Sequence, residues 1–194
     1  MRVLLLGLPL LIAGCAADAA NDTRDLRLGP FQQVDGTRHL RATLGGSGQS
    51  NSRTSISDGY SPGYGVNVLF YDLDGREGRW LFDGAPRAIL SDDPVRDSLA
   101  VQAFLFEVVE EDTNSDDELT PADARTLFIA DPEGRRVVPL AEGVEGLRQQ
   151  VRLDEGRVLV LFDANDAVEG VEVELETLKA EPRIAMPPAP SAGV

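Results

Sequence analysis

Histidine and cysteine are almost missing from this sequence, which has one residue of each, His39 and Cys15. A single cysteine excludes an intramolecular disulfide. A single histidine with no acid or nucleophile beside it excludes a histidine-based triad, and no G-x-S-x-G elbow or metalloprotease helix is present. His39 lies in an alternating segment, residues 39–44, and is interpreted as a solvent-facing strand residue. Most nucleophilic and zinc chemistries are therefore excluded.

Basic residues are also scarce. Lys and Arg number 18 against 33 Asp and Glu, which gives a formal net charge of -15. A surface this acidic is repelled by nucleic acid and by anionic lipid headgroups, and it tolerates bound cations. We therefore expect no nucleic-acid partner. The hydrophobic content of 42% is ample for a packed core, and 194 residues suit one domain with short flanking segments.

The chain begins with an apolar run that is too short to span a bilayer. Arg2 precedes about ten apolar residues, 3–12, and the small residues Ala13 and Gly14 lead to Cys15. This stretch resembles a bacterial lipoprotein signal with its lipobox. The alternatives are a plain secretory signal with a stray thiol, or a buried apolar strand.

The lipoprotein resemblance implies how the start of the chain is processed. Residues 1–14 would be removed as a signal peptide, and Cys15 would carry diacylglycerol on its sulfur and an acyl group on its amino terminus. Several acyl chains anchor a protein stably where one does so only marginally. Residues 15–23 would then form a lipidated tether. Ala16 stands where a lipoprotein retained in the inner membrane often carries Asp, so the resemblance favours the outer membrane of the cell envelope.

Residues 24–181 are expected to form a mainly β domain. Several segments alternate apolar and polar residues, and the clearest places Val171, Val173 and Leu175 opposite three glutamates, as in a strand with one wet face. The run 99–109 favours a central strand because it is apolar, β-branched and aromatic. Residues 45–65 are predicted to form a mobile loop, in which Tyr60 and Tyr64 could contact a ligand, and residues 182–194 a disordered Pro/Ala tail.

Two segments of this domain share one layout. Residues 69–84 and 127–143 each read as a strand, an acidic turn with Gly, a second strand and an acid-Gly pair. This layout resembles the middle hairpin of periplasmic WD-like propeller repeats. Two copies cannot close a propeller, which needs about four blades. The resemblance therefore implies antiparallel hairpins in a small open sheet or sandwich of two blade-like units.

The acidic segment 112–123, DTNSDDELTPAD, is the strongest candidate site. Oxygen-bearing residues recur at alternating positions, as a hard cation with roughly six to eight oxygen ligands requires. This spacing resembles an EF-hand or dockerin calcium loop, and the resemblance implies as ligands the side chains or, for the glutamate, the backbone carbonyl of Asp112, Asn114, Asp116, Glu118, Thr120 and Asp123.

The acidic segment also departs from the calcium-loop pattern. Asp117 replaces the Gly of the sixth position, and Asp123 replaces the Glu of the twelfth, which shortens the bidentate reach and weakens calcium relative to magnesium. Thr120 and Pro121 indicate a short helix over residues 121–125. We expect a weak Ca²⁺ site, and the alternative is a solvated acidic turn.

These features favour a membrane-anchored, exported binding or envelope-assembly module, with an envelope protein or glycan as partner and no catalytic residues. The alternatives are a carboxylate-dependent exported hydrolase, whose paired acids the sequence does not locate, and a purely structural envelope lipoprotein without metal.

Overall fold

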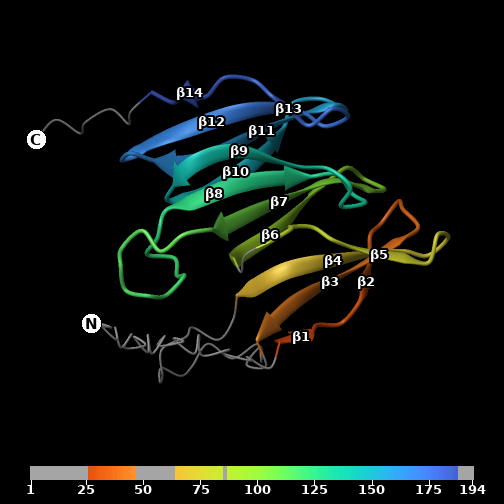
Figure 1. The fold of residues 1–194 in the computed structure, drawn as a ribbon. Helices are drawn as coiled ribbons and strands as arrows, with labels where there is room; N and C mark the ends of the chain where they lie inside the picture. Colours follow the sequence, from red (N-terminus) through yellow and green to blue (C-terminus); the bar gives the residue numbers. More distant parts are fainter. Residues whose placement is uncertain (1–25, 47–63, 85–86, 188–194) are drawn as a thin grey trace, which may run out of the picture.

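The computed structural model describes residues 26–46, 64–84 and 87–187, and this part of the chain consists of strands and connecting turns with no helix (Figure 1). Within it, no helix is long and apolar enough to cross a membrane. The predicted signal peptide, Cys15, the tether, residues 47–63 of the predicted mobile loop and residues 188–194 of the tail lie outside the described residues.

The described part of the chain is built from strands, and the mainly β prediction is confirmed. They are β1 (Leu26–Leu28), β2 (Gln32–Gln33), β3 (His39–Gly46), β4 (Gly65–Asp72), β5 (Glu77–Trp80), β6 (Ala88–Arg96), β7 (Val101–Val109), β8 (Arg125–Ala130), β9 (Val137–Val144), β10 (Gly146–Arg152), β11 (Arg157–Ala164), β12 (Ala167–Glu174), β13 (Lys179–Ala180) and β14 (Ile184–Ala185).

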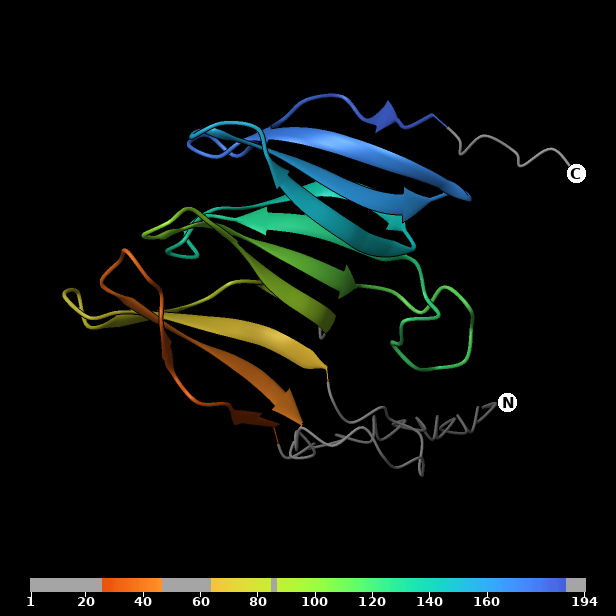
Figure 2. The same cartoon turned by 180° about the vertical axis from the view of Figure 1, so that it is seen from behind.

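The strands stack in three layers (Figures 1 and 2). One nine-stranded antiparallel sheet has the order β1-β3-β4-β6-β7-β8-β9, with β2 on β3 and β5 on β4. Its halves meet through one residue pair, Gly65 with Ile89, so β1–β5 form a first layer and β6–β9 a second. The third layer is the five-stranded sheet β10–β14. None of these sheets closes on itself, which confirms the open arrangement.

The second layer is buried on both faces, which explains why β7 reads as a continuous apolar run rather than an alternating one. Leu105 of β7 and Ile129 of β8 face a core shared with the third layer. Phe104, Phe106 and Phe128 face a core shared with the first layer. A strand covered on both sides needs apolar residues at every position.

Aromatic rings join the first two layers. Phe70 of β4 meets Phe104 of β7 edge to face, with ring centroids 5.9 Å apart. Phe82 meets Phe128 in the same way at 5.3 Å. The guanidinium of Arg41 lies 4.5 Å above the Phe104 ring and donates to Asp92. Such ring pairs contribute about 0.5–1.5 kcal/mol each beyond their buried area.

The third layer confirms the predicted alternation at 171–176. Val171, Val173 and Leu175 are buried against the second layer, whereas the intervening glutamates are partly or fully exposed. β11 and β12 are joined by the two-residue turn Asn165-Asp166, in which both residues have positive φ. This geometry matches the right-handed twist of the flanking strands.

Four expectations differ from the structure. His39 is buried, with 7% of its surface exposed, because its face of β3 is turned toward the second layer. The predicted short helix is absent, and residues 121–123 form a single turn before β8 begins. β14 lies in the tail predicted to be disordered and pairs with β12. The two similar hairpins, β4–β5 and β8–β9, fall in the first and second layers, and β10–β14 add a third layer to the predicted two units.

Candidate cation site in the acidic loop

The acidic loop connects β7 to β8 and extends from one end of the second layer, opposite the β4–β5 and β8–β9 turns (Figures 1 and 2). Asp112 follows the last residue of β7 closely, Asp116 lies at the far part of the loop, and Asp123 comes just before β8. β7 and β8 are paired up to Val108 and Thr126. This pairing brings the two ends of the loop together and so places Asp112 and Asp123, its first and last acids, near each other.

Asp112 folds the first half of the loop around its own carboxylate. One oxygen, Oδ1, accepts hydrogen bonds from the amides of Ser115 at 2.6 Å and Asp116 at 3.3 Å, and Oδ2 accepts from Asp117 at 2.8 Å. Ser115 and Asp117 have φ of 64° and 65°. The sixth position therefore does adopt the left-handed conformation that favours Gly, and Asp117 takes it at some cost in backbone strain.

Asp123 closes the second half of the loop. It is 4% exposed, and its Oδ1 accepts from the amides of Thr113 at 2.8 Å and Asn114 at 3.2 Å, while Oδ2 accepts from the amide of Thr120 at 2.9 Å. Burial alone raises the pKa of Asp123, but the hydrogen bonds from Thr120, Thr113 and Asn114 outweigh it and hold the pKa below its usual value. Asp123 is thus held as a carboxylate.

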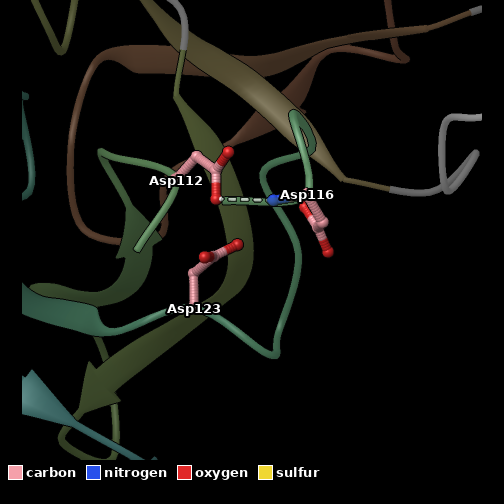
Figure 3. A group of neighbouring side chains, drawn as sticks. All are labelled: Asp112, Asp116 and Asp123. Carbon is pink, nitrogen blue, oxygen red and sulfur yellow. Dashed lines mark hydrogen bonds between the residues drawn. The ribbon is translucent and has the colours of Figure 1, made fainter. Parts of the chain in front are cut away.

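The carboxylates of Asp112, Asp116 and Asp123 converge, with one oxygen of each within 4.8 Å of the others (Figure 3). They occupy the first, fifth and twelfth positions of the loop. Each carboxylate oxygen has two lone pairs, so an oxygen that accepts one amide hydrogen bond can still coordinate a cation. Three like charges at this separation repel one another, and a divalent cation between them would relieve that repulsion. The arrangement could hold a metal ion.

The other three predicted ligands lie around this group. Asn114 donates through Nδ2 to Asp116 at 2.9 Å and accepts the Asp116 amide through Oδ1. Thr120 is bound to Asp123 through its amide, and its hydroxyl accepts from Ala122 at 3.2 Å. Glu118 stands outside the three converging carboxylates, and its amide donates to Asp116 at 2.9 Å. Asn114 and Thr120 thus position two of the converging acids.

A partly buried ion pair that the sequence does not predict anchors the loop to the body of the protein. Arg125 donates to the carbonyl of Pro121 at 3.1 Å and to Glu107 at 3.3 Å. Glu107, near the end of β7, also accepts from the amide of Leu147 at 2.6 Å and from the hydroxyl of Ser91. The signal was available: Glu107 is the single charge inside the longest apolar run, and buried charges are rare unless paired.

Fold and site together define the class of this protein: an all-β domain of stacked antiparallel sheets, not closed into a ring, with an acidic loop at one end. No family model and no curated protein matches the chain.

Solved structures similar to it include the following two. One is the β-propeller domain of the Trilobed protease from Pyrococcus furiosus, described as having an open velcro topology, at 10% identity and a TM-score of 0.42 over 84% of this chain. This chain spans 43% of that chain's length. The other is the structure of Tne2 in complex with Tni2, at 12% identity and a TM-score of 0.43, covering 78% of this chain and 99% of that one. At identities and TM-scores this low, the fold class rests on the chain's own strand order.

Proposed function

We propose that this protein is a lipid-anchored, exported binding or assembly module of the cell envelope, and that its acidic loop is a weak calcium site. The observation that carries the calcium proposal is the convergence of Asp112, Asp116 and Asp123 from separate parts of one loop. The anchoring proposal is supported by Arg2, the apolar run and Cys15.

Calcium suits this loop better than a transition metal because all the converging ligands are carboxylate oxygens. The site is weak for two reasons. Asp123 already uses both oxygens for hydrogen bonds, and Asp117 must keep a positive φ to form the turn. We expect a dissociation constant of about 0.1 to 1 mM, as in extracellular modules, where calcium is abundant enough to occupy such a site.

The consequence of binding would be structural. A cation held by Asp112 and Asp123 would join the end of β7 to the start of β8, and Asp116 would tie the far part of the loop to them. The ordered loop would then present a fixed surface at one end of the stack, which is what a binding module requires. Without the cation, three carboxylates repel one another across that surface.

Calcium addition to the purified protein tests this site. At about 10 mM calcium, binding with the expected constant stabilises the folded state by about 1.4 to 2.7 kcal/mol. The melting temperature should rise by about 3 to 10 °C relative to the same protein in EDTA. The variant Asp112→Ala/Asp116→Ala, compared with its own melting temperature in EDTA, should show no rise.

A matched control separates the site from general screening of an acidic protein. Glu155→Gln/Glu176→Gln also removes two negative charges, from exposed turns remote in sequence from the loop. It should keep the full calcium response. An equal response in both double variants, or none in the parent at several millimolar calcium, would show that the loop is a solvated acidic turn.

The anchor has its own test. Cys15→Ser should move the protein from the membrane fraction to the soluble fraction of the cell envelope, because the sulfur that would carry the lipid is gone. Persistent membrane association of Cys15→Ser that detergent reverses would overturn the anchoring proposal and leave the calcium proposal intact.

A further inference from the structure

The first layer has one face that no other layer covers in the described part of the chain (Figures 1 and 2). Phe70 of β4 contacts Phe104 of the second layer, so Phe70 points inward. Successive residues of a strand point to opposite faces, and paired residues of neighbouring strands point to the same face. Leu69 and its partners in the register, Ala42 of β3 and Trp80 of β5, therefore point away from the second layer. This side of β1–β5 is called the outer face below.

The outer face carries no charge at its strand positions. The registers of β1, β3, β4 and β5 place only uncharged residues there, and apart from Asn67 and glycines these are aliphatic or aromatic. Leu26, Leu28 and Trp80 are exposed by 45%, 41% and 41%. Phe31, which directly precedes β2 in the same layer, is 50% exposed. A contiguous exposed apolar patch marks a surface that contacts a partner or a membrane.

The other end of the stack has a different outer surface. In the third layer Val171 and Val173 point inward, so the alternate positions of β12, Glu172 and Glu174, point outward. Arg157 of β11 pairs with Glu174 in the register and donates to Glu172. That surface is charged, as a surface in contact with water usually is. Of the two outermost faces of one stack, only the outer face of the first layer has the composition of a covered surface.

The path of the chain indicates what covers the outer face. Leu26, the first residue of β1, follows Cys15 by eleven positions, and eleven residues span at most about 36 to 40 Å. With lipid on Cys15, as proposed above, the first layer is held close to the bilayer before the other two layers. A tether this short gives the face a high effective concentration at the lipid surface, so a weak apolar contact is sufficient.

Charge favours a neutral lipid surface over a second copy of the chain. Two copies, each with a formal net charge of -15, repel one another at contact, and so do the protein and an anionic lipid. A zwitterionic lipid surface carries no net charge and opposes no charge on the outer face. Tryptophan is also the residue that sits best at the boundary between headgroups and acyl chains, because its ring is apolar and its N–H is polar.

We propose that the outer face of the first layer lies on the zwitterionic lipid surface to which the chain is tethered, a proposal that rests on the lipid anchor at Cys15. Trp80, Leu26 and Leu28 enter the headgroup region, and the strands of the first layer run along the bilayer. The second and third layers, with the charged surface of β11 and β12, stay in water. The lipid contact and the acyl chains together make the attachment stable.

The emission of Trp80, the only tryptophan, reports on this face. The lipidated protein is reconstituted in phosphatidylcholine vesicles in EDTA, which keeps calcium out of the acidic loop. Flotation of the vesicles tests the anchor, and phosphatidylcholine with brominated acyl chains tests the face. Brominated lipid should quench Trp80, because bromine quenches only a ring that it contacts, and acrylamide dissolved in the water should quench Trp80 weakly.

The variant Leu26→Glu/Leu28→Glu places two carboxylates on the outer face. It should float with the vesicles, lose the quenching by brominated lipid and become severalfold more open to acrylamide, because a carboxylate is costly to desolvate. Leu99→Glu/Leu153→Glu is the matched control. It makes the same change at two leucines that are 86% and 43% exposed, in the β6–β7 and β10–β11 turns, and it should be quenched as the parent is.

Failure of the face and failure of the anchor give different results. A parent protein that floats but is not quenched by brominated lipid, or an equal loss of quenching in both double variants, would overturn this proposal and leave the anchor intact. Protection from acrylamide that grows with the ratio of protein to lipid, without quenching by brominated lipid, would overturn it in favour of a second copy. A parent protein that does not float would overturn the anchor, and this proposal with it.

Discussion

Asp123 is the residue on which both halves of the acidic loop depend. Its two oxygens accept amide hydrogens from residues on opposite sides of the loop, Thr113 and Thr120, although they are seven positions apart in the sequence. No other acid of the loop joins both halves in this way. Asp112 binds only amides of its own half, and Asp116 binds its immediate neighbours. The charge state of Asp123 therefore controls whether the loop stays closed.

The depressed pKa of Asp123 predicts how the loop responds to acid. The folded state favours the carboxylate, so the stabilisation is present above pH about 4, the ordinary value, and is lost as the pH falls through the lower folded pKa. The amide NMR signals of Thr113 and Thr120 should shift together, with one shared inflection below pH 4. Asp123→Asn should remove that inflection, and Asp166→Asn, in the β11–β12 turn, should retain it. Separate inflections for the two amides would show that Asp123 does not couple the halves.

At the scale of single residues, the sequence predicts the acids of the loop but not the residues that anchor the loop to the rest of the protein. Spacing alone places Asp112, Asp116 and Asp123 in one cluster, because positions within a twelve-residue loop are constrained by the chain itself. The Arg125–Glu107–Leu147 contacts join residues up to 40 positions apart, and no local pattern reports them. His39 shows the same limit: alternation tells which residues share a face of β3, not which face another layer covers.

Among the connecting elements, the β8–β9 turn is held by contacts of its own and also packs against another layer. The acidic turn expected within residues 127–143 is formed by Asp131-Pro132-Glu133-Gly134, and Asp131 stabilises it by accepting the amide of Glu133. The turn also packs on the first layer. A Cβ added at Gly134 would lie 2.4 Å from the Phe70 ring, so glycine is needed here for close approach as well as for its φ of 67°.

Two glycines of the β8–β9 hairpin allow the energetic cost of backbone strain to be measured apart from the cost of close packing. Gly143, near the other end of β9, has the same φ of 67° and nothing within 4 Å of an added Cβ. Gly143→Ala should cost about 1–2 kcal/mol, the price of a left-handed alanine. Gly134→Ala should cost about 1–3 kcal/mol more, because the Phe70 ring must also move. Urea unfolding of both variants measures the difference. Equal free energies of unfolding would mean that the turn does not press on the first layer.

The elements that the sequence predicts best are those with strict alternation, such as the segment that buries Val171, Val173 and Leu175 and leaves the intervening glutamates partly or fully exposed. The helix expected at 121–125 fails for a physical reason. Its start signal is real, because the Thr120 hydroxyl accepts the Ala122 amide and Asp123 accepts the Thr120 amide. A start signal fixes one turn only, and a helix needs further residues to offset the cost of that turn. Here the chain enters β8 at Arg125 instead.

At the scale of the whole molecule, the second layer is shared between two hydrophobic cores. Its two faces belong to two cores, one with the first layer and one with the third. If the third layer were removed, Leu105, Leu127 and Ile129, all fully buried, would face water. The sequence shows that strands of this kind must be covered, but not by which segments, because the pairing of layers is set by contacts between distant parts of the chain. That is why the third layer could not be assigned from the two matching hairpins.

This sharing predicts that the three layers unfold as one unit. Val160 of β11 is fully buried in the core between the second and third layers. Val160→Ala should lower the free energy of unfolding by about 2 kcal/mol through lost apolar burial and the cavity left behind. Trp80, in the first layer, is the probe. Because loss of the third layer would leave the second uncovered, the urea midpoint of Trp80 fluorescence should fall by the same amount as the midpoint of far-ultraviolet circular dichroism.

The control for that experiment is Gln149→Ala, an exposed change in the same third layer, for which the free energy of unfolding from either probe should stay within about 0.5 kcal/mol of the parent value. If Val160→Ala instead split the dichroism transition in two and left the Trp80 midpoint where it was, the first and second layers would be stable without the third.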